Sequence, residues 1–218
     1  AFGGRWHAED SNAVVGHLNT PETAAAVEFY RSLLQLGPKG AENLGYGETL
    51  EAFLNGSTAM VCNYFAFFPT IQEKMSAKVG FAVVPGKDGK RVASLGGQGL
   101  SISSHIAPER KELAKKFIAW FLQQKQQEQW ITKPAGFTAN TAILASAAFR
   151  AQTPYNAPFA DSIDTMRDFW NVPVFNELLN VTQKQLGKAI DGEVPVRQAL
   201  DELAREKERI LEEAGLLP

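Results

Sequence analysis

Helical segments with an apolar side alternate with short apolar runs along this chain, and this alternation constrains its fold more than any other feature. Apolar residues recur at steps of three and four from Ala24 to Leu34. Thr20 is the predicted cap of this helix, Pro21 takes its first position, and Gly37-Pro38 is expected to end it. A shorter helix is expected to end at Asn55-Gly56. The apolar run 58–62 that follows predicts a buried strand. Mixed helices and strands in this order indicate an α/β or α+β protein rather than a helical bundle.

The rest of the chain also combines predicted helices with predicted strands. Five further elements are predicted: strands at 79–84 and 100–103, and helices near 108–124, 174–190 and 195–214. Residues 151–175 are expected to be loop-like because three prolines interrupt them. The last helix has a clear apolar side, made by Val196, Ala199, Leu200, Leu203, Ile210 and Leu211.

Composition excludes several classes of protein. The chain has 218 residues, of which 44% are hydrophobic and 21% charged, close to the average of soluble globular domains. No apolar stretch approaches the ~18 residues that a membrane-spanning helix needs. The net charge of −2 offers no basic excess with which to neutralise phosphates, so no nucleic-acid partner is expected.

The first residues and the single cysteine add two expectations. The chain opens with Ala1-Phe2-Gly3-Gly4-Arg5-Trp6 and no initiator Met, which is typical of the interior of a protein and indicates a processed or truncated chain. Cys62 is the one cysteine, so an internal disulfide framework and a multi-cysteine zinc site are excluded. Its apolar neighbours Met60 and Val61 predict that the thiol is buried.

Motifs of catalysis and cofactor binding are missing from the sequence. There is no nucleophile elbow, no His-Glu-x-x-His helix and no Walker loop, and the three histidines lack ligand-like spacing. The glycine-rich loop 96–99 precedes an apparent strand, whereas a dinucleotide fingerprint opens a helix. Asp161, Asp164 and Asp168 would share one helical face, which is better explained as a solvated face than as paired catalytic carboxylates. We therefore expect no catalytic residue, no metal site and no cofactor.

Aromatic residues next to turn or loop residues are the remaining signal. They occur in the run 63–69, at Trp170 and at Trp6, which follows a glycine pair. A flat apolar ring with amides and hydroxyls nearby suits a neutral, hydroxyl-rich ligand. Phe67 and Phe68 of that run are interpreted as core residues instead, and so are Trp120 and Trp130.

The order of several sequence runs is similar to that of a known family. These runs are "FYRSLLQLGP", "EAFLNGSTAMV", "VGFAVVPGKDGK", "SLGGQGLSIS", "KKFIAWFLQ", "AGFTANTAIL", "FW" and "VRQALDELAREKERIL". In this order they resemble the family 1 extracellular solute-binding proteins of ABC importers over nearly the whole chain. The similarity begins midway through the family pattern, so the chain resembles the C-terminal half.

The resemblance implies an α/β fold of the periplasmic-binding-protein type (type II, two-lobed). Residues 1–98 and 134–218 would form the C-terminal ligand-binding lobe, and residues 99–133 would belong to the N-terminal lobe of the intact protein. The apolar side chains around Phe117, Ile118 and Phe121 would then lack their usual cover. Self-association of this fragment is therefore expected to cover them, and otherwise the segment should be poorly ordered.

The resemblance also implies a function. Such a protein is a substrate-binding component that traps a small carbohydrate or polyol in the interlobe cleft and delivers it to ABC permease subunits in the membrane. It has no catalytic residues, and it is periplasmic or extracellular, either free or lipid-anchored in the intact protein. Together with Trp6 from the aromatic pattern, the expected ligand-binding residues are Asn63, Tyr64, Phe65, Gly97, Gln98, Gly136, Phe137, Thr138 and Trp170.

Two departures from the family pattern bear on the ligand. Ala66 and Gln98 stand where many members of the family carry Trp. Fewer flat rings and one more amide favour a small polar ligand, such as a polyol or a monosaccharide, over a long maltodextrin. Which solute is bound is not decided by these residues.

Two other classes of function stay open. A carbohydrate-active hydrolase needs two carboxylates ~5–10 Å apart across a cleft, and the sequence names no such pair. A structural or interaction domain would use the long C-terminal helices as a partner surface.

Overall fold

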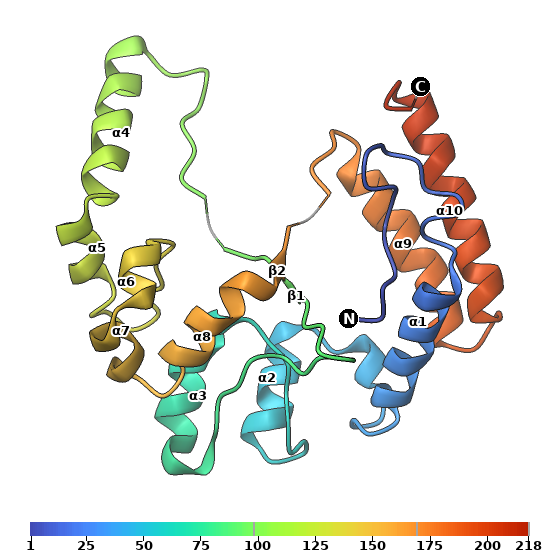
Figure 1. The fold of residues 1–218 in the computed structure, drawn as a ribbon, viewed down its shortest axis with the longest axis horizontal. Helices are drawn as coiled ribbons and strands as arrows, with labels where there is room; N and C mark the ends of the chain where they lie inside the picture. The colour runs from blue at the N-terminus through green and yellow to red at the C-terminus, as the bar shows by residue number, and fades with distance from the viewer. Residues whose placement is uncertain (98, 169, 218) are drawn as a thin grey trace. The chain divides into compact units, whose positions relative to one another are not determined.

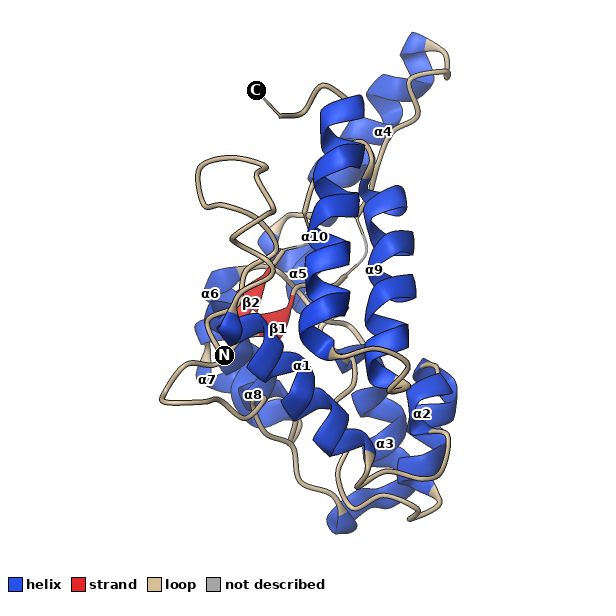
Figure 2. Ribbon diagram, turned by 90° about the vertical axis from the view of Figure 1, so that its right-hand side faces the viewer, coloured by secondary structure: helices blue, strands red, loops and turns tan. Residues whose placement is uncertain are grey.

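Helices make up most of the regular structure in the computed structural model (Figures 1 and 2). The structure describes residues 1–97, 99–168 and 170–217. The α-helices are α1 (Pro21–Leu34), α2 (Tyr46–Leu54), α3 (Phe68–Met75), α4 (Pro108–Phe121), α5 (Gln124–Trp130), α6 (Thr141–Ala145), α7 (Ala147–Gln152), α8 (Asn156–Ser162), α9 (Phe175–Ile190) and α10 (Val196–Glu213). Single 3-10 turns are at Ala41–Asn43, Phe65–Phe67, Ser76–Lys78 and Ile163–Thr165, and the strands are β1 (Ala93–Ser94) and β2 (Met166–Arg167).

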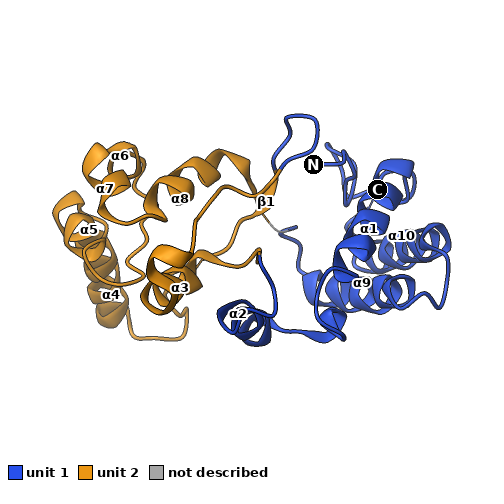
Figure 3. Cartoon of the chain, turned by 90° about the horizontal axis from the view of Figure 1, so that it is seen from below, with its two compact units in different colours: residues 1–59, 86–91, 169–218 blue, residues 60–85, 92–168 orange. Residues whose placement is uncertain are grey.

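The chain divides into two compact units, coloured separately in Figure 3. Unit 1 comprises residues 1–59, 86–91 and 169–218, and unit 2 comprises residues 60–85 and 92–168. The expected lobe of residues 1–98 and 134–218, with residues 99–133 in another lobe of an intact protein, stays a prediction.

Unit 1 is built around helices α9 and α10, which lie side by side (Figures 1 and 2). The buried side of α10 supplies most of the core, and α1 packs against it. The buried core residues of this unit are Val14, Leu18, Leu178, Ala189, Val196, Ala199, Leu200, Leu203, Ala204, Ile210 and Leu211. The predicted apolar side of the last helix is therefore confirmed.

The N-terminal segment of unit 1 (residues 1–20) is fastened to α10 by polar contacts. The carboxylate of Glu208 accepts hydrogen bonds from the backbone N–H groups of Val14 and Val15, at 3.3 and 2.6 Å. The Asn19 amide donates to Asp201 at 2.7 Å. A segment without helix or strand is thus held in place by one face of a helix.

Unit 2 combines short helices with a minimal parallel sheet. Strands β1 and β2 pair in parallel, with Ala93 opposite Met166 and Ser94 opposite Arg167. Helices α6, α7 and α8 surround a small core of Ile143, Leu144, Phe149 and Phe159. This core places the aromatic residues of the segments 63–68 and 137–138 close to α8.

The predicted helices are confirmed where the sequence carries clear signals. Thr20 caps α1 by accepting a hydrogen bond from the Thr23 N–H, as expected from its position before Pro21. Helices α4, α9 and α10 begin and end within three residues of their predicted limits. Gly192, with φ +77, forms the turn between α9 and α10.

The three predicted strands are wrong. Residues 58–62, 79–84 and 100–103 form no ladder in the described part of the chain. Their apolar pattern suits a strand, but a strand exists only where a neighbouring segment accepts and donates its backbone hydrogen bonds. Within the described residues, the sheet forms instead at β1 and β2, which have no strong apolar pattern.

The predicted loop over 151–175 is also wrong in part, because α8 lies within it. Pro158 is the third residue of α8, where its missing N–H costs no intrahelical bond. Since α8 ends at Ser162, the three aspartates do not share a helical face as expected. Asp161 instead forms an exposed ion pair with Arg150, at 2.7 Å.

Three burial predictions are corrected by unit 2. Cys62 is exposed, because the residues around it are not part of a buried strand. Trp120 and Trp130, interpreted as core residues, are 47% and 41% exposed. Helix α4 has no buried residue, and Phe117 on it is 55% exposed. Among the described residues, no neighbour buries its apolar stripe completely.

Candidate functional site

Trp170 is held in unit 1 by polar and aromatic neighbours. Its indole Nε1–H donates to the Asn12 side chain at 3.1 Å. The ring of His7 stacks on it with centroids 4.3 Å apart and 22° between the planes. Trp170 is half-buried and packs against the core of α9 and α10. It is therefore a fixed ring with polar groups at its edge and its face, not one enclosed by apolar side chains.

Trp6 lies in the same cluster. It is 51% exposed, and the Nζ of Lys207 lies over its ring, 4.5 Å from the centroid. The same Nζ is 5.7 Å from the centroid of Trp170. The structure thus brings together two of the predicted site residues, which are far apart in the sequence. We call Trp6, His7, Asn12, Trp170 and Lys207 the indole cluster.

Lys207 is a member of this cluster that the sequence patterns above do not single out. It is 4% exposed, and burial lowers the pKa of its ammonium to about 8 from 10.5. A signal was available in the sequence. The apolar side of α10 steps from Leu203 to Leu211 through position 207, where a charged residue interrupts it.

Asn63 and Tyr64 lie in unit 2, in the extended segment before the 3-10 turn Phe65–Phe67. Tyr64 is 38% exposed. A Cβ on Gly96 would lie 3.2 Å from the Tyr64 ring, so the glycine lets the ring approach the backbone closely. Gly97 follows, exposed and with φ +137, and Gln98 lies outside the described residues.

Phe65 and Phe137 pack into the core of unit 2. Their ring centroids are 6.1 Å apart, and those of Phe65 and Phe159 are 4.5 Å apart with nearly perpendicular planes. Both residues are half-buried. Their rings therefore contribute to packing in this chain, whatever surface they also offer to a ligand.

Gly136 and Thr138 are buried, and their polar groups are used within unit 2. The Thr138 hydroxyl donates to the Gln127 side chain at 2.7 Å and accepts from the Asn140 N–H at 3.0 Å. A Cβ on Gly136 would collide with the carbonyl oxygen of Trp130. Both residues join α5 to α6, a structural task that the sequence did not reveal.

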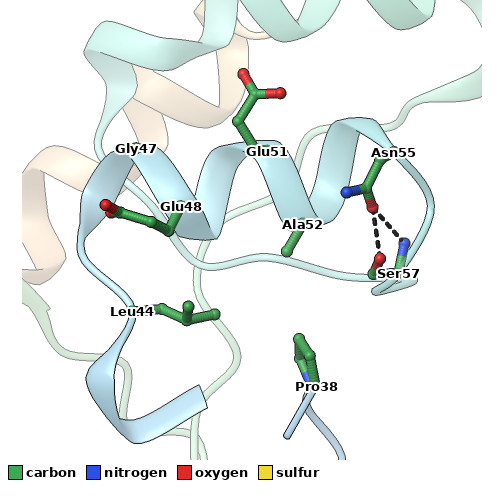
Figure 4. A pocket seen from close by; sticks show the side chains of 8 residues that line it. All are labelled: Pro38, Leu44, Gly47, Glu48, Glu51, Ala52, Asn55 and Ser57. Carbon is green, nitrogen blue, oxygen red and sulfur yellow. Dashed lines mark hydrogen bonds between the residues drawn. The ribbon is translucent and has the colours of Figure 1, made fainter. Parts of the chain in front are cut away.

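A separate shallow groove lies over α2 in unit 1 (Figure 4). Figure 4 shows Ala52 directed toward Pro38 and Leu44, and Glu51 directed away from them. The groove is lined by Pro38, Leu44, Gly47, Glu48, Glu51, Ala52, Asn55 and Ser57. None of the predicted site residues lines it.

No group of three or more His, Cys, Asp or Glu side chains is placed to hold a metal ion within residues 1–97, 99–168 and 170–217. Within the same ranges, no helix is both long enough and apolar enough to cross a bilayer.

Comparison with a family model gives a match over more than half of the chain. Residues 1–128 match the model described as bacterial extracellular solute-binding protein. The matched range contains Trp6, Asn63, Tyr64, Phe65 and Gly97.

Comparison with individual proteins extends the similarity to nearly the whole chain. A mannitol-binding protein of Pseudomonas aeruginosa is 27% identical, over 99% of this chain and 53% of that protein. The maltose-bound MalE3 of T. maritima has a TM-score of 0.81 and 25% identity, over 96% of this chain and 55% of that chain. An ABC transporter solute-binding protein of Agrobacterium radiobacter K84, in complex with ribitol, has a TM-score of 0.76 and 23% identity. The match covers 95% of this chain and 53% of that chain.

The comparisons also show how much of each relative this chain covers. This chain spans about half the length of the relatives that it matches. The similarity in structure confirms the predicted fold type, that of two-lobed periplasmic binding proteins. This chain corresponds to about half of such a two-lobed protein.

Proposed function

The chain belongs to the bacterial extracellular solute-binding protein family, and on this premise we propose that it is the substrate-binding component of an ABC importer. It binds a small carbohydrate or polyol and delivers it to permease subunits in the membrane. It works outside the cytoplasmic membrane, in the periplasm or at the cell surface, either free or lipid-anchored. Binding is its whole activity, because its family is one of binding proteins and not of enzymes.

One observation carries the choice of ligand class. The mannitol-binding relative aligns with 99% of this chain, and the solved relatives were captured with ribitol and with maltose. Mannitol and ribitol are linear polyols with a hydroxyl on every carbon. The departures at Ala66 and Gln98 agree with a ligand of this size, because they replace flat rings with a methyl group and an amide.

The indole cluster is the proposed ligand-contacting surface of unit 1. A polyol presents C–H groups between its hydroxyls, and these groups pack on the faces of aromatic rings. Trp6 has half of its surface exposed for such contacts, and Trp170 is oriented by its bond to Asn12. In unit 2, the exposed Tyr64 and Gly97 are proposed as contacts, with Asn63 and Gln98 as amide partners of hydroxyl groups.

The buried residues of the predicted set have a different proposed role. Gly136 and Thr138 have no exposed group to offer, so we assign them to the support of the segment that carries Phe137. Phe65 and Phe137 give this segment its aromatic packing. The ligand then contacts the surface that these residues hold in place.

Isothermal titration calorimetry tests the proposal. The protein at its full encoded length is titrated with D-mannitol, ribitol, maltose and glucose, and saturable binding of a polyol or small sugar is expected. Trp170→Ala should weaken this binding by about 0.5–1.5 kcal/mol, the contribution of an aromatic face. Trp170→Phe should keep part of the affinity, and Tyr46→Ala, an exposed ring elsewhere in unit 1, should bind like the unmodified protein.

The same samples separate the alternatives. Release of new reducing ends from an oligosaccharide would favour the carbohydrate-active hydrolase. No binding of any member of the panel would contradict the proposal and favour a structural or interaction domain.

A further inference from the structure

Lys207 lies at a position of α10 where an apolar residue is expected. Its neighbours one turn away on the same face are Leu203, Ala204, Ile210 and Leu211, and all of them are buried. Only 4% of Lys207 is exposed. Burying an ammonium costs free energy unless a partner compensates for the lost water. The residue therefore needs a physical explanation beyond packing.

Two indole rings are the partners that the structure provides. The Nζ lies 4.5 Å from the ring centroid of Trp6 and 5.7 Å from that of Trp170, both within the range of cation–π attraction. None of the ion pairs formed among residues 1–97, 99–168 and 170–217 includes Lys207. In place of a carboxylate, the ammonium therefore has the faces of two aromatic rings as its neighbours.

The two rings come from segments that no shared element of secondary structure connects. Trp6 belongs to the N-terminal segment, and Trp170 precedes α9. Bonds at the edges tie these segments together, since Asn12 accepts from Trp170 and donates to the Leu216 carbonyl oxygen. Those bonds fix one edge of Trp170, whereas Trp6 contacts Lys207 through the face of its ring. The Lys207 ammonium contacts both rings.

We propose that Lys207 is a positioning residue, which holds Trp6 and Trp170 in one fixed arrangement for the ligand through its charge. As a statement about ligand binding, this rests on the function proposed above. The positioning itself is a property of unit 1 and exists without ligand. An apolar side chain of similar length would fill the same space and avoid the cost of burial, but it would lose the attraction to the ring faces.

The role of the Lys207 charge can be tested by changing the pH, because the ammonium loses its charge when it releases its proton. Burial lowers the pKa of its ammonium to about 8, which places the loss of the charge within an accessible pH range. The surrounding elements carry other groups that must be told apart from it. On the N-terminal segment these are His7 and the exposed Arg5–Glu9 pair, on α10 Glu206 and Glu208, and on α9 Lys184 and Lys188, while residues 170–174 carry no charge.

An ordinary His titrates near ~6.5, carboxylates near ~4 and exposed lysines near ~10.4. An α-amino group and a cysteine thiol lie closer to pH 8, so a change at the indoles near pH 8 is assigned to Lys207 by its loss in the Lys207→Met variant.

The first experiment follows the indole Nε1–H signals of Trp6 and Trp170 by ¹⁵N-resolved NMR between pH 5.5 and 9.5. Trp120→Phe and Trp130→Phe remove the other two indoles, which lie in unit 2. Both remaining signals should shift with one midpoint at about pH 8. Lys207→Met should abolish that step, and Lys184→Met, which removes an exposed lysine from α9, should leave it unchanged.

The second experiment measures affinity for the polyol that the unmodified protein binds. Lys207→Met should weaken binding roughly 3- to 30-fold, the scale of a desolvated cation–π contact. Lys207→Arg retains the charge and should restore most of the affinity. The Met variant should nevertheless be at least as resistant to urea as the unmodified protein, which a purely structural role for the charge would not produce.

The outcomes are distinct for the two proposals. Indole signals without a step near pH 8, a step that survives Lys207→Met, or unchanged affinity in a polyol-binding Lys207→Met protein would each overturn the role of Lys207. If the unmodified protein binds no sugar or polyol but shows the Lys207-dependent step, the proposed function fails and the positioning stands.

Discussion

Helices α10 and α4 both carry an apolar stripe along one side, but they differ in what faces that stripe. Helix α10 lies against α9, α1 and the N-terminal segment, and eight of its residues are buried. Helix α4 contacts mainly the short α5, and none of its residues is buried. The hydrophobic effect stabilises a stripe only when a second apolar surface covers it. Both helices have the amphipathic pattern, but of the two α10 alone has buried residues. An amphipathic pattern therefore does not by itself predict burial.

The largest expected effect comes from deleting a core side chain of α10. Leu203 is fully buried, so Leu203→Ala should lower the free energy of unfolding of unit 1 by about 2–5 kcal/mol. Urea unfolding followed by the fluorescence of Trp6 and Trp170, with Trp120 and Trp130 replaced by Phe, measures this. A loss below about 1 kcal/mol, the level of an average substitution, would contradict the packed core described for α10.

A change of the opposite sign is expected at Lys207. The folded protein releases the Lys207 proton near pH 8 and the unfolded chain near pH 10.5. Between these values the unfolded state binds more protons, so this group makes the free energy of unfolding rise with pH. Below pH 8 its burial costs about 3 kcal/mol, at ~1.4 kcal/mol for each pKa unit.

Lys207→Met removes that cost. The variant should therefore be more stable than the unmodified protein at pH 7, and the advantage should shrink as the pH rises toward 10.5. Urea unfolding at a series of pH values measures the difference, with Lys184→Met as the control for an exposed lysine. A variant that is less stable at pH 7 would show that the contacts of the ammonium outweigh its desolvation.

A smaller effect is expected for the buried hydroxyl of unit 2. Thr138→Val keeps the shape of the side chain but leaves the Gln127 amide oxygen without its donor, which should cost about 1–3 kcal/mol. Thr132→Val is the matched control, since this threonine is exposed and its hydroxyl donates to the Gln129 carbonyl oxygen. Hydrogen exchange of the amides in α5 and α6 measures both. Equal protection in the two variants would contradict a structural role for Thr138.

The smallest effect is expected on α4. Because Phe117 is 55% exposed, Phe117→Ala should change the free energy of unfolding by no more than ~0.5 kcal/mol. Circular dichroism during urea unfolding measures it, at low and at high protein concentration. A loss as large as that of Leu203→Ala would show that the α4 stripe is covered in solution, and dependence on concentration would identify a second copy as the cover.

The predictability of this chain differs between its helices and its strands. Thr20, Pro21 and Gly192 act on their own neighbours, so the limits of α1, α9 and α10 could be predicted closely. The strand predictions failed because residues 58–62 and 79–84 resemble strands by composition but form no ladder in the described part of the chain. Cys62 is exposed for the same reason.

The candidate site was predictable in its residue types more than in its contacts. Aromatic residues beside turns identified Trp6 and Trp170, and the structure brings both to the Lys207 ammonium. Their shared neighbour Lys207 was not identified, because a lysine on a helix normally extends into water. The structure shows that the Thr138 hydroxyl bonds Gln127, a contact that the sequence did not predict, while its expected contact with ligand stays a prediction.

The sequence by itself determined the positions of the main helices and the family, because caps, turns and the order of sequence runs are properties of neighbouring residues. The tertiary structure decided which apolar stripe is buried, where a strand forms and what surrounds Lys207. Each of these depends on a surface from a distant part of the chain: α9 for α10, β2 for β1, and Trp6 and Trp170 for the ammonium. Burial and ladder hydrogen bonds are made between segments, so no single segment encodes them.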